Sequence, residues 1–396
     1  MPTGYTPIYK IMKGGLDITN HFNDRTTEIQ VVLKNAGDSA TCKITVDDRD
    51  WRIDTVEVGV KIEVYLGYKE VGLAQMGVFE VNTVDYVIMP KQIEIVGNST
   101  GFTGAIKAPK IENFQNQKLG DIIKKLAGDK TENVYVDPKL ADVELPFMNM
   151  NSSPIHMLHE LERRFDATGQ FINGKYVFVP RDEDAEGGGL DMPVTLIEPW
   201  HVTKGFVRHT QRARYDGVKV GWIDKDHIKN FVEVQDPNAD KEADGTTQGD
   251  MFLSKQLGRT EEEAQAMARS QMAQLKRAQG EAHLSLAKGN PWIRDQGRIL
   301  LRRFQSEVNG SYVNDTVTHT YTKEPGLSTE ILAKPPGDGA DYDSLDESQF
   351  WKLGTEGLGV PYAPATALLD FTELPPEYQT APRETPVEIE TAPVST

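Results

Sequence analysis

Three runs of alternating apolar and polar residues follow one another between Val56 and Asn98. In the first run, from Val56 to Tyr68, every second residue is Val, Ile, Leu or Tyr, and the pattern resumes at Val78–Val81 and at Ile93–Val96. This period of two puts the apolar side chains on one face of a half-buried strand. Short breaks that contain glycine or proline separate the runs, so an antiparallel meander is predicted.

A second stretch, over residues 297–331, repeats features of this meander. Two explanations are open: two meanders share turn chemistry by chance, or one chain contains two similar β domains. Three pairs of segments define the repeat. They are Gly59–Val64 with Gly297–Arg302, Gly77-Val78-Phe79 and the following Thr83-Val84 with Gly310-Ser311-Tyr312 and Thr316-Val317, and Glu94-Ile95 with Glu330-Ile331.

Residues 1–105 contain further strand-like runs before the meander, at Ile8–Ile11, Ile29–Leu33 and Cys42–Val46. Glycine and asparagine between these runs supply turns. Together with the meander, the runs provide enough strands for a small barrel or sandwich. We therefore expect a first β-barrel domain over residues 1–105.

Residues 106–180 have the period of helices. An apolar stripe at helical spacing runs through Gln117–Leu126. Ser153 and Pro154 fit the N-cap and the first turn of a second helix. Asn173-Gly174 lies between alternating apolar residues, which is a strong hairpin signal. A small α+β middle domain is the interpretation.

Residues 181–335 return to strand-like runs and contain one strong helix signal. Thr260 and Glu263 have the spacing of a capping box, acidic residues fill the first turn, basic residues fill the last turn, and Gly280 follows. We expect a helix over Thr260–Gln279 within a second β-barrel domain. The predicted fold is thus mainly β, with an α+β insert between two barrels.

The segment 336–396 differs in composition from the rest of the chain. It carries 12 acids, 2 bases and eight prolines, which predicts an extended or disordered tail. Phe350-Trp351 and Leu368–Phe371 are apolar islands in this tail. They are either ordinary variation or short docking segments that become ordered on a neighbouring chain.

Charge and composition exclude several classes of protein. The net charge is −17 without a basic cluster, which argues against a grip on nucleic acid. No apolar run is long enough to span a membrane, and the N-terminus lacks the features of a signal peptide. Cys42 is the single cysteine, so we expect no internal disulfide, and assembly in a reducing compartment fits.

One segment fits the pattern of a hydrolase nucleophile. Gly97–Gly101 reads G-x-S-x-G, with Ser99 directly after a predicted strand. A nucleophile elbow requires a helix next, but further glycines and Pro109 follow. A turn that ends the strand is the preferred interpretation.

Two other groups of residues could bind a metal ion. His156 and His159 lie three residues apart on a predicted helix, followed by Glu160, but the sequence indicates no third ligand. The acidic loop Asp236–Gly245 resembles a calcium loop, yet Met251 stands where the bidentate glutamate belongs. We predict no catalytic, cofactor-binding or metal-binding residues, and hence a structural protein rather than an enzyme.

The order of four stretches resembles the late control protein D family, the baseplate hub proteins of contractile-tailed phages, which are similar to the hub part of VgrG spikes. The resemblance covers about residues 5–335, and the tail is longer than the family pattern. The stretches are Gly15–Thr19; Val64–Tyr68 with Met76–Val81 and Ile93–Gly97; Leu145–Asn151 with Leu158, Phe165 and Asn173-Gly174; and Gly297–Thr320.

This resemblance implies a homotrimer in which each chain contributes two domains similar to a tail-tube subunit. Three chains then present six such domains, which adapts a sixfold tail tube to a threefold central spike around the DNA exit channel. The implied partners are the spike, the tube or tube-initiating protein, baseplate wedge proteins and the tape measure protein. The implied location is the virion tail, after assembly of this late protein in the host cytoplasm.

Two other functions stay open at this point. A tail-associated cell-wall hydrolase would depend on Ser99 or His159. A carbohydrate-binding receptor module would show clustered exposed aromatic residues, whereas the five tryptophans are scattered along the chain. They are Trp51, Trp200, Trp222, Trp292 and Trp351.

Overall fold

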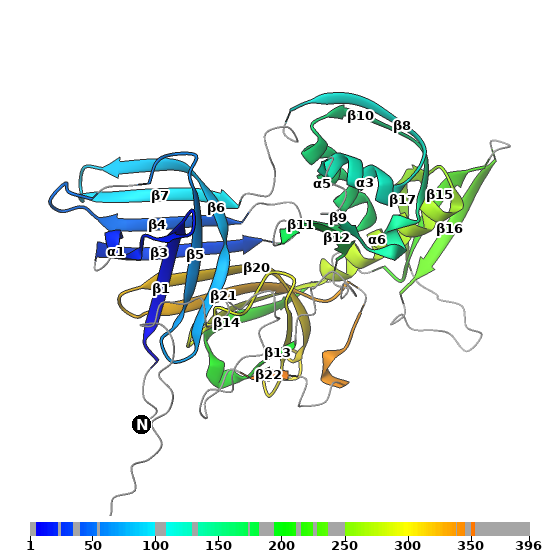
Figure 1. The fold of residues 1–396 in the computed structure, drawn as a ribbon. Coiled ribbons are helices and arrows are strands. Elements are labelled where there is room, and N and C mark those ends of the chain that lie inside the picture. Colours follow the sequence, from blue (N-terminus) through cyan, green and yellow to red (C-terminus); the bar gives the residue numbers. More distant parts are fainter. Residues whose placement is uncertain are drawn as a thin grey trace, which may run out of the picture.

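The computed structural model places two parts side by side: a β-rich part and a smaller lobe of helices and short sheets (Figure 1). The fold is mainly β with antiparallel sheets, as predicted. The residues described are 5–22, 25–34, 40–53, 56–99, 108–128, 134–172, 175–181, 194–210, 215–224, 228–236, 250–337, 339–344 and 350–352.

The first half of the β-rich part contains the predicted meander, which strands β5, β6 and β7 form. The strand order is β3-β4-β7-β6-β5-β1-β2, and every neighbouring pair is antiparallel. The elements are β1 (Pro7–Lys13), β2 (Leu16–Asp17), α1 (Thr19–Phe22), β3 (Thr26–Lys34), β4 (Thr41–Asp47), β5 (Lys61–Tyr68), β6 (Gly72–Val87) and β7 (Gln92–Ser99).

The second half repeats this order as β14-β18-β21-β20, with β19 on β20 and β13 on β19. The pairing of β13 with β19 is parallel, whereas the equivalent pair of β1 and β5 is antiparallel. The elements are β13 (Val194–Ile197), η3 (Pro199–His201), β14 (Val202–His209), β18 (Gly280–Leu286), β19 (Arg298–Leu301), β20 (Gly310–Thr322) and β21 (Leu327–Lys334).

Irregularities of the two halves also coincide. The register of β6 on β7 shifts between Val81 and Thr83, and the register of β20 on β21 shifts between Asn314 and Thr316. Similarly, β3 shifts on β4 two residues after Thr26, as β14 does on β18 after Val202. Because a β-bulge is a local feature of sequence and register, two coincident bulges support duplication over chance.

One of the three predicted segment matches is out of register. The Gly59 amide donates to Val81 O (2.7 Å), and the Gln296 amide donates to Asn314 O (2.9 Å). Gly59 therefore corresponds to Gln296 rather than to Gly297, and both have positive φ, +87° and +60°. The match of Gly59–Val64 with Gly297–Arg302 was wrong by one residue. The residue with positive φ in the second half is Gln296, and Gly297 is the residue after it.

The two halves share one sheet and one core. Strand β20 pairs with β3, which joins the halves into a 14-stranded sheet. The buried apolar cluster includes Ile44 and Val64 from the first half and Leu284 and Val317 from the second. Burial of this continuous apolar surface holds the halves together.

The smaller lobe confirms the predicted α+β character of the middle segment. The apolar stripe of the first predicted helix is buried, and the Ser153 hydroxyl accepts from the His156 amide (3.4 Å) as an N-cap. Strands β11 and β12 pair as far as Ile172 with Lys175; the turn residues 173–174 lie outside the described residues. The elements are β8 (Lys110–Lys118), α3 (Leu119–Ala127), β9 (Val134–Val136), α4 (Pro138–Ala141), β10 (Glu144–Ser152), α5 (Pro154–Phe165), β11 (Ala167–Ile172) and β12 (Lys175–Pro180).

The long helix lies in this lobe and not in the second barrel-like half, where we expected it. Helix α6 (Glu261–Arg277) packs on a three-stranded sheet of β15 (Gly217–Ile223), β16 (Lys229–Gln235) and β17 (Met251–Gly258). Its apolar stripe, including Met267, covers Val218 and Val220. This sheet supplies the apolar surface that the stripe requires.

The ends of α6 follow the predicted signals only in part. The Thr260 hydroxyl accepts from the Glu263 amide (3.1 Å), as a cap should. The Glu263 carboxylate accepts from the Arg259 amide (2.7 Å), one residue before the partner that a full capping box would use. The helix ends at Arg277, two residues before the predicted end, because Gly280 already pairs with His209 in the large sheet.

Part of the segment after residue 335 adds to the fold. Strand β22 (Phe350–Lys352) pairs in parallel with β13 of its own chain, and η4 (Tyr342–Ser344) precedes it. The backbone of the island Phe350-Trp351 therefore pairs with β13 within the chain. The island Leu368–Phe371 lies outside the described residues. Within the residues described, no helix is long and apolar enough to cross a membrane.

Candidate assembly interface

The junction of β3 with β20 is the longest-range contact of the sheet. Seven residue pairs form it, from Thr316 opposite Lys34 to Thr322 opposite Glu28. On the core side, Val317 and His319 of β20 lie opposite Leu33 and Val31 of β3, and all four are buried. The junction is therefore a built interface between the two equivalent halves.

His319 is the buried polar group at this junction. Its Nε2 lies 3.0 Å from Ile293 O, and its Nδ1 lies 3.0 Å from Thr329 Oγ1. Because a carbonyl only accepts, Nε2–H donates to Ile293 and Nδ1 accepts from the hydroxyl. Burial, with the charge of Arg294 second, lowers the pKa of His319 from 6.5 to about 3. The imidazole is therefore neutral and serves a structural role.

Arg294 connects the second half to the first. Its guanidinium donates to Met76 O (3.1 Å) and to Gln75 O on β6. Burial lowers the pKa of this side chain, and the nearby Asp295 opposes that effect. Two backbone carbonyls thus accept from a half-buried cation, which binds the strand β6 to the loop before β19.

A second bridge lies at the C-terminal end of β5. The Tyr68 hydroxyl donates to Gly289 O (2.7 Å), and the Lys288 ammonium lies 5.2 Å from the centre of the Tyr68 ring. Partial burial lowers the pKa of Lys288 to about 8. Together with Arg294, this bridge fixes the orientation of the two halves.

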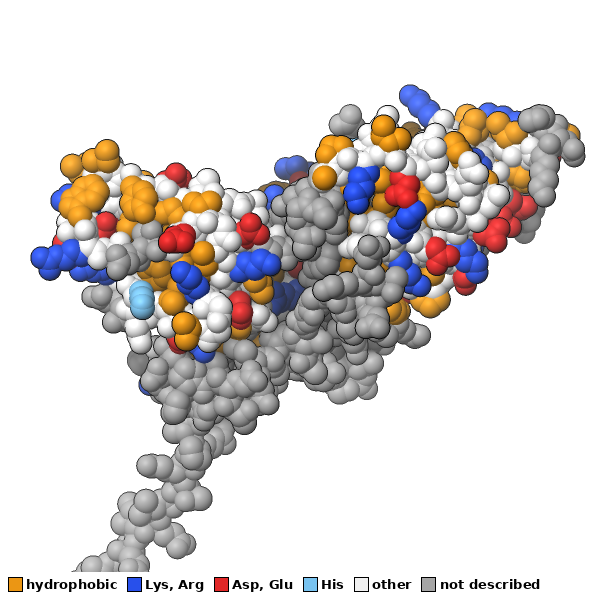
Figure 2. Space-filling model, turned by 45° about the horizontal axis from the view of Figure 1, so that its top comes forward, with side chains coloured by type: hydrophobic (Ala, Val, Ile, Leu, Met, Phe, Trp, Pro, Cys, Tyr) orange, Lys and Arg blue, Asp and Glu red, His pale blue; other side chains and the backbone are white. Residues whose placement is uncertain are grey.

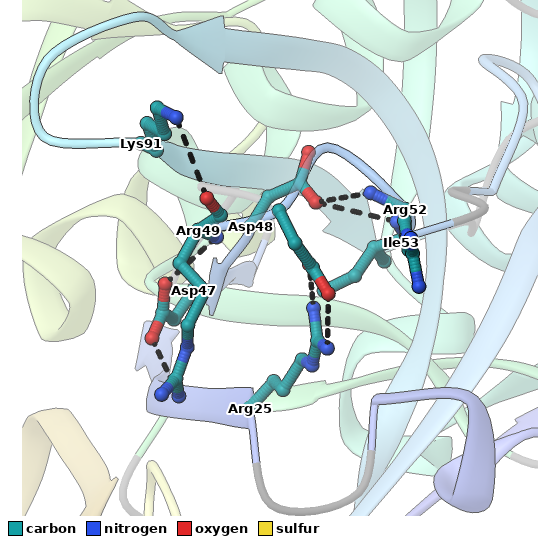
Figure 3. Close-up of polar contacts among 8 residues, drawn as sticks. Arg25, Asp47, Asp48, Arg49, Arg52, Ile53 and Lys91 are labelled. Atoms are coloured by element: carbon teal, nitrogen blue, oxygen red, sulfur yellow. Dashed lines mark hydrogen bonds and ion pairs between the residues drawn. The ribbon is translucent and has the colours of Figure 1, made fainter.

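Polar contacts also fix the loop after β4 (Figure 3). Arg25 makes a two-pronged ion pair with Asp50, and this contact lowers the pKa of the Asp50 carboxyl to about 2. The Asp48 carboxylate accepts from the amides of Arg52 (2.9 Å) and Ile53 (3.2 Å). In addition, the Asp48 amide donates to the Lys91 carbonyl (3.1 Å), which anchors the turn between β6 and β7.

Two strand edges lie open beside these fixed elements. β6 pairs with β7 through Thr83–Val87, and β14 pairs with β18. Among the described residues, no strand pairs with the opposite side of Thr83–Val87 or with the far side of β14. The end of β6 forms an outer edge in Figure 1, and Figure 2 shows hydrophobic side chains gathered there. Open edges are ready templates for pairing with another chain.

The contacts described for Ser99 are those of a strand residue. This residue belongs to β7, and its amide donates to Ala40 O (2.7 Å). A Cβ atom on Gly97 would meet Glu80 O at 2.9 Å, so this glycine serves the close packing of strands. Residues 100–107, where an elbow helix would begin, lie outside the described residues, and the next described element is the strand β8.

Two of the metal-binding candidates, His159 and Asp236, contact other side chains. His159 Nδ1 lies 3.2 Å from the carboxylate of Glu162, which also accepts from the Tyr176 hydroxyl (3.4 Å). Asp236 pairs with Lys276 (2.8 Å), and residues 237–249 of the acidic loop are not described. No group of three or more metal-ligating side chains occurs within the described ranges.

Buried ion pairs instead connect the helices of the lobe. Arg164 on α5 pairs with Glu263 on α6, and Arg277 at the end of α6 pairs with Asp166 just after α5. Both contacts hold α6 against the α+β segment. The sequence signals singled out neither these pairs nor the open edges, because their partners lie far apart along the chain.

No protein-family model matches the chain. A curated relative, the probable baseplate hub protein of Escherichia phage 186, is 21% identical over 222 residues, 56% of this chain. The match covers 57% of the length of that relative.

Solved structures extend the similarity to the fold. The tail protein from Neisseria meningitidis MC58 has a TM-score of 0.60 at 11% identity, covering 85% of this chain and 99% of that protein. The 43 kDa tail protein of prophage MuSo2 from Shewanella oneidensis has a TM-score of 0.57 at 13% identity, covering 84% and 99%. The chain has the fold of these phage tail proteins and is similar in sequence to a probable baseplate hub protein.

Proposed function

We propose that this protein is the structural hub of a phage tail baseplate or of a phage-like injection machine. It forms a homotrimer that adapts a sixfold contractile tail tube to a threefold central spike and surrounds the DNA exit channel. The protein has no enzymatic role in this proposal. The relatives in sequence and in fold are named as hub and tail proteins, which supports a structural protein rather than an enzyme.

The observation that carries the proposal is the duplication of the sheet. One chain contains the same strand order twice, with bulges at the same positions in both copies. A trimer of such a chain presents six equivalent units around one axis. An assembly of this kind can meet a ring of six subunits on one side and a threefold object on the other.

We propose the following division of labour within the chain. Residues 5–99 form the first tube-like unit, and residues 194–209 with 280–334 form the second. Residues 110–180 lie between the two units in sequence, and residues 215–277 interrupt the second unit. Together they form the lobe, which is available for contacts with wedge proteins. The acidic composition keeps DNA phosphates from adhering during passage through the channel.

The mass of the full chain in solution tests this proposal. A chain of 44.1 kDa should sediment as a species of three copies, alone or with the tube protein of the same particle. Electron micrographs of that species should show a ring with six peripheral densities. A strict monomer under both conditions would overturn the proposal.

A further inference from the structure

The two open edges correspond to the two strands that pair within the chain. By strand order and bulge position, β6 is the equivalent of β20, and β14 is the equivalent of β3. β20 and β3 bind each other across the junction of the halves. β6 and β14 have no such partner among the described residues, and they lie on different halves.

Exposure of apolar side chains on β6 shows what a partner strand would cover. His319 on β20 lies opposite Val31 of β3 and is fully buried. Tyr321, two residues later, packs partly buried against the core. The equivalent positions in the first half are Tyr86 on β6, which is 59% exposed, and Ile88 in the turn directly after β6, which is 72% exposed. These large apolar groups occupy positions that a partner strand would cover.

We propose that β14 of one copy pairs, antiparallel, with the open edge of β6 in the next copy. The inference rests on the proposed trimer and names the surface that closes it. The register follows from the pairing of β20 with β3. It places Val84 opposite His209, Asp85 opposite Arg208, Tyr86 opposite Val207 and Val87 opposite Phe206.

The chemistry of the two edges is complementary in this register. Asp85 lies opposite Glu94 on β7, so a like charge is its cross-strand neighbour. Arg208 pairs with Glu281 in its own chain (2.7 Å) but is largely exposed. Arg208 from the next copy would place an opposite charge on the other side of Asp85, and such pairs stabilise sheets. Phe206, which is 47% exposed, would cover Val87 on the same face.

The contact is of the type that forms a closed ring when the rotation per step divides a full turn. The two edges differ, so the contact is heterologous and each copy offers one of each. The junction inside a chain and the contact between chains then use equivalent strands. Six equivalent steps, alternately within and between chains, require three copies.

Disulfide cross-linking tests this register on the full chain. Asp85→Cys and Arg208→Cys in one chain should yield, on mild oxidation, a covalent trimer on a denaturing gel. The native Cys42 is buried and does not compete. As a matched control, Asp85→Cys is combined with Lys204→Cys. Lys204 lies on the same edge and face of β14 as Arg208, but about 13 Å from Arg208 along the strand. The control should give at least tenfold less covalent product, because Cα atoms more than about 7 Å apart cannot be bridged.

Mixing of single variants tests the direction of the contact. Chains with only Asp85→Cys, mixed with chains with only Arg208→Cys, should give covalent dimers, and each variant alone should give none. A trimer by mass that does not cross-link in the double variant would overturn this register and leave the hub proposal standing. Equal product with the control pair would overturn the register as well. A monomer in every condition would overturn both proposals.

Discussion

Gly77 and Gly310 hold the same place in the two halves of the sheet, with φ angles of +154° and +152°. Each is followed two residues later by a buried aromatic ring, Phe79 or Tyr312, which packs back on the glycine. A Cβ atom at Gly77 would lie 3.2 Å from the Phe79 ring, and one at Gly310 would lie 3.6 Å from the Tyr312 ring. The glycine and the ring thus form one unit that occurs twice.

This relationship predicts the ranking of two substitutions. Both Gly77→Ala and Gly310→Ala should lower the free energy of unfolding, by about 1–3 kcal/mol, because a side chain strains the backbone at positive φ. Gly77→Ala should cost more, since its Cβ also crowds the ring. Urea titrations of the two variants and the parent chain measure the effect, and a larger loss for Gly310→Ala would contradict this account.

Because His319 is buried and neutral, the free energy of unfolding should depend on pH. Its pKa is lowered to about 3 in the folded chain from the ordinary value of 6.5, which the unfolded chain keeps, so the unfolded chain binds a proton first as the pH falls. The contribution to stability is complete above pH 6.5 and is lost as the pH falls from 6.5 towards 3. The slope is about 1.4 kcal/mol per pH unit at most.

Unfolding by urea at pH 7, 6 and 5 measures this slope. The variant His319→Gln, which keeps a polar group at the site but does not titrate, should lose stability less steeply between pH 6.5 and 5. Carboxylates titrate mainly below this range and affect both proteins alike. Identical slopes for parent and variant would show that His319 is not a buried neutral group.

Substitution of Arg294 should strongly lower the stability of the junction between the halves. Arg294→Met should lower the free energy of unfolding by about 3 kcal/mol, because the carbonyls of Gln75 and Met76 lose their charged donor while staying buried. Arg294→Lys should recover only part of this loss, since one ammonium cannot reproduce the planar fork. The exposed Arg269→Met on α6 is the matched control, with a change within about 0.5 kcal/mol.

The hydrolase alternative gives a direct experiment. The full chain should release no soluble fragments from peptidoglycan, and Ser99→Ala and His159→Ala should behave like the parent. The Ser99 amide donates to Ala40 O, and the His159 ring contacts the Glu162 carboxylate, so the described contacts of these two residues do not join them as a nucleophile and base. Turnover that either substitution abolishes would contradict the structural role.

Local patterns predicted many of the elements correctly. Most of the alternation over Val56–Asn98 became β5, β6 and β7, although β5 begins only at Lys61. The caps at Ser153 and Thr260 start α5 and α6. The repeat of Gly77-Val78-Phe79 as Gly310-Ser311-Tyr312 is present as a repeat of strand order. These signals work because strand period, helix caps and tight turns depend on neighbours along the chain.

The sequence by itself determined the periods of the strands, the starts of the helices and the presence of two similar meanders, since each depends on a few adjacent residues. Only the tertiary structure decided that β3 joins β20, that α6 packs in the lobe, and that Gln296 rather than Gly297 matches Gly59. Such pairings join residues far apart in the chain, and many partners offer similar hydrogen bonds and apolar surface. Their selection depends on the fit of the whole core, which no local pattern records.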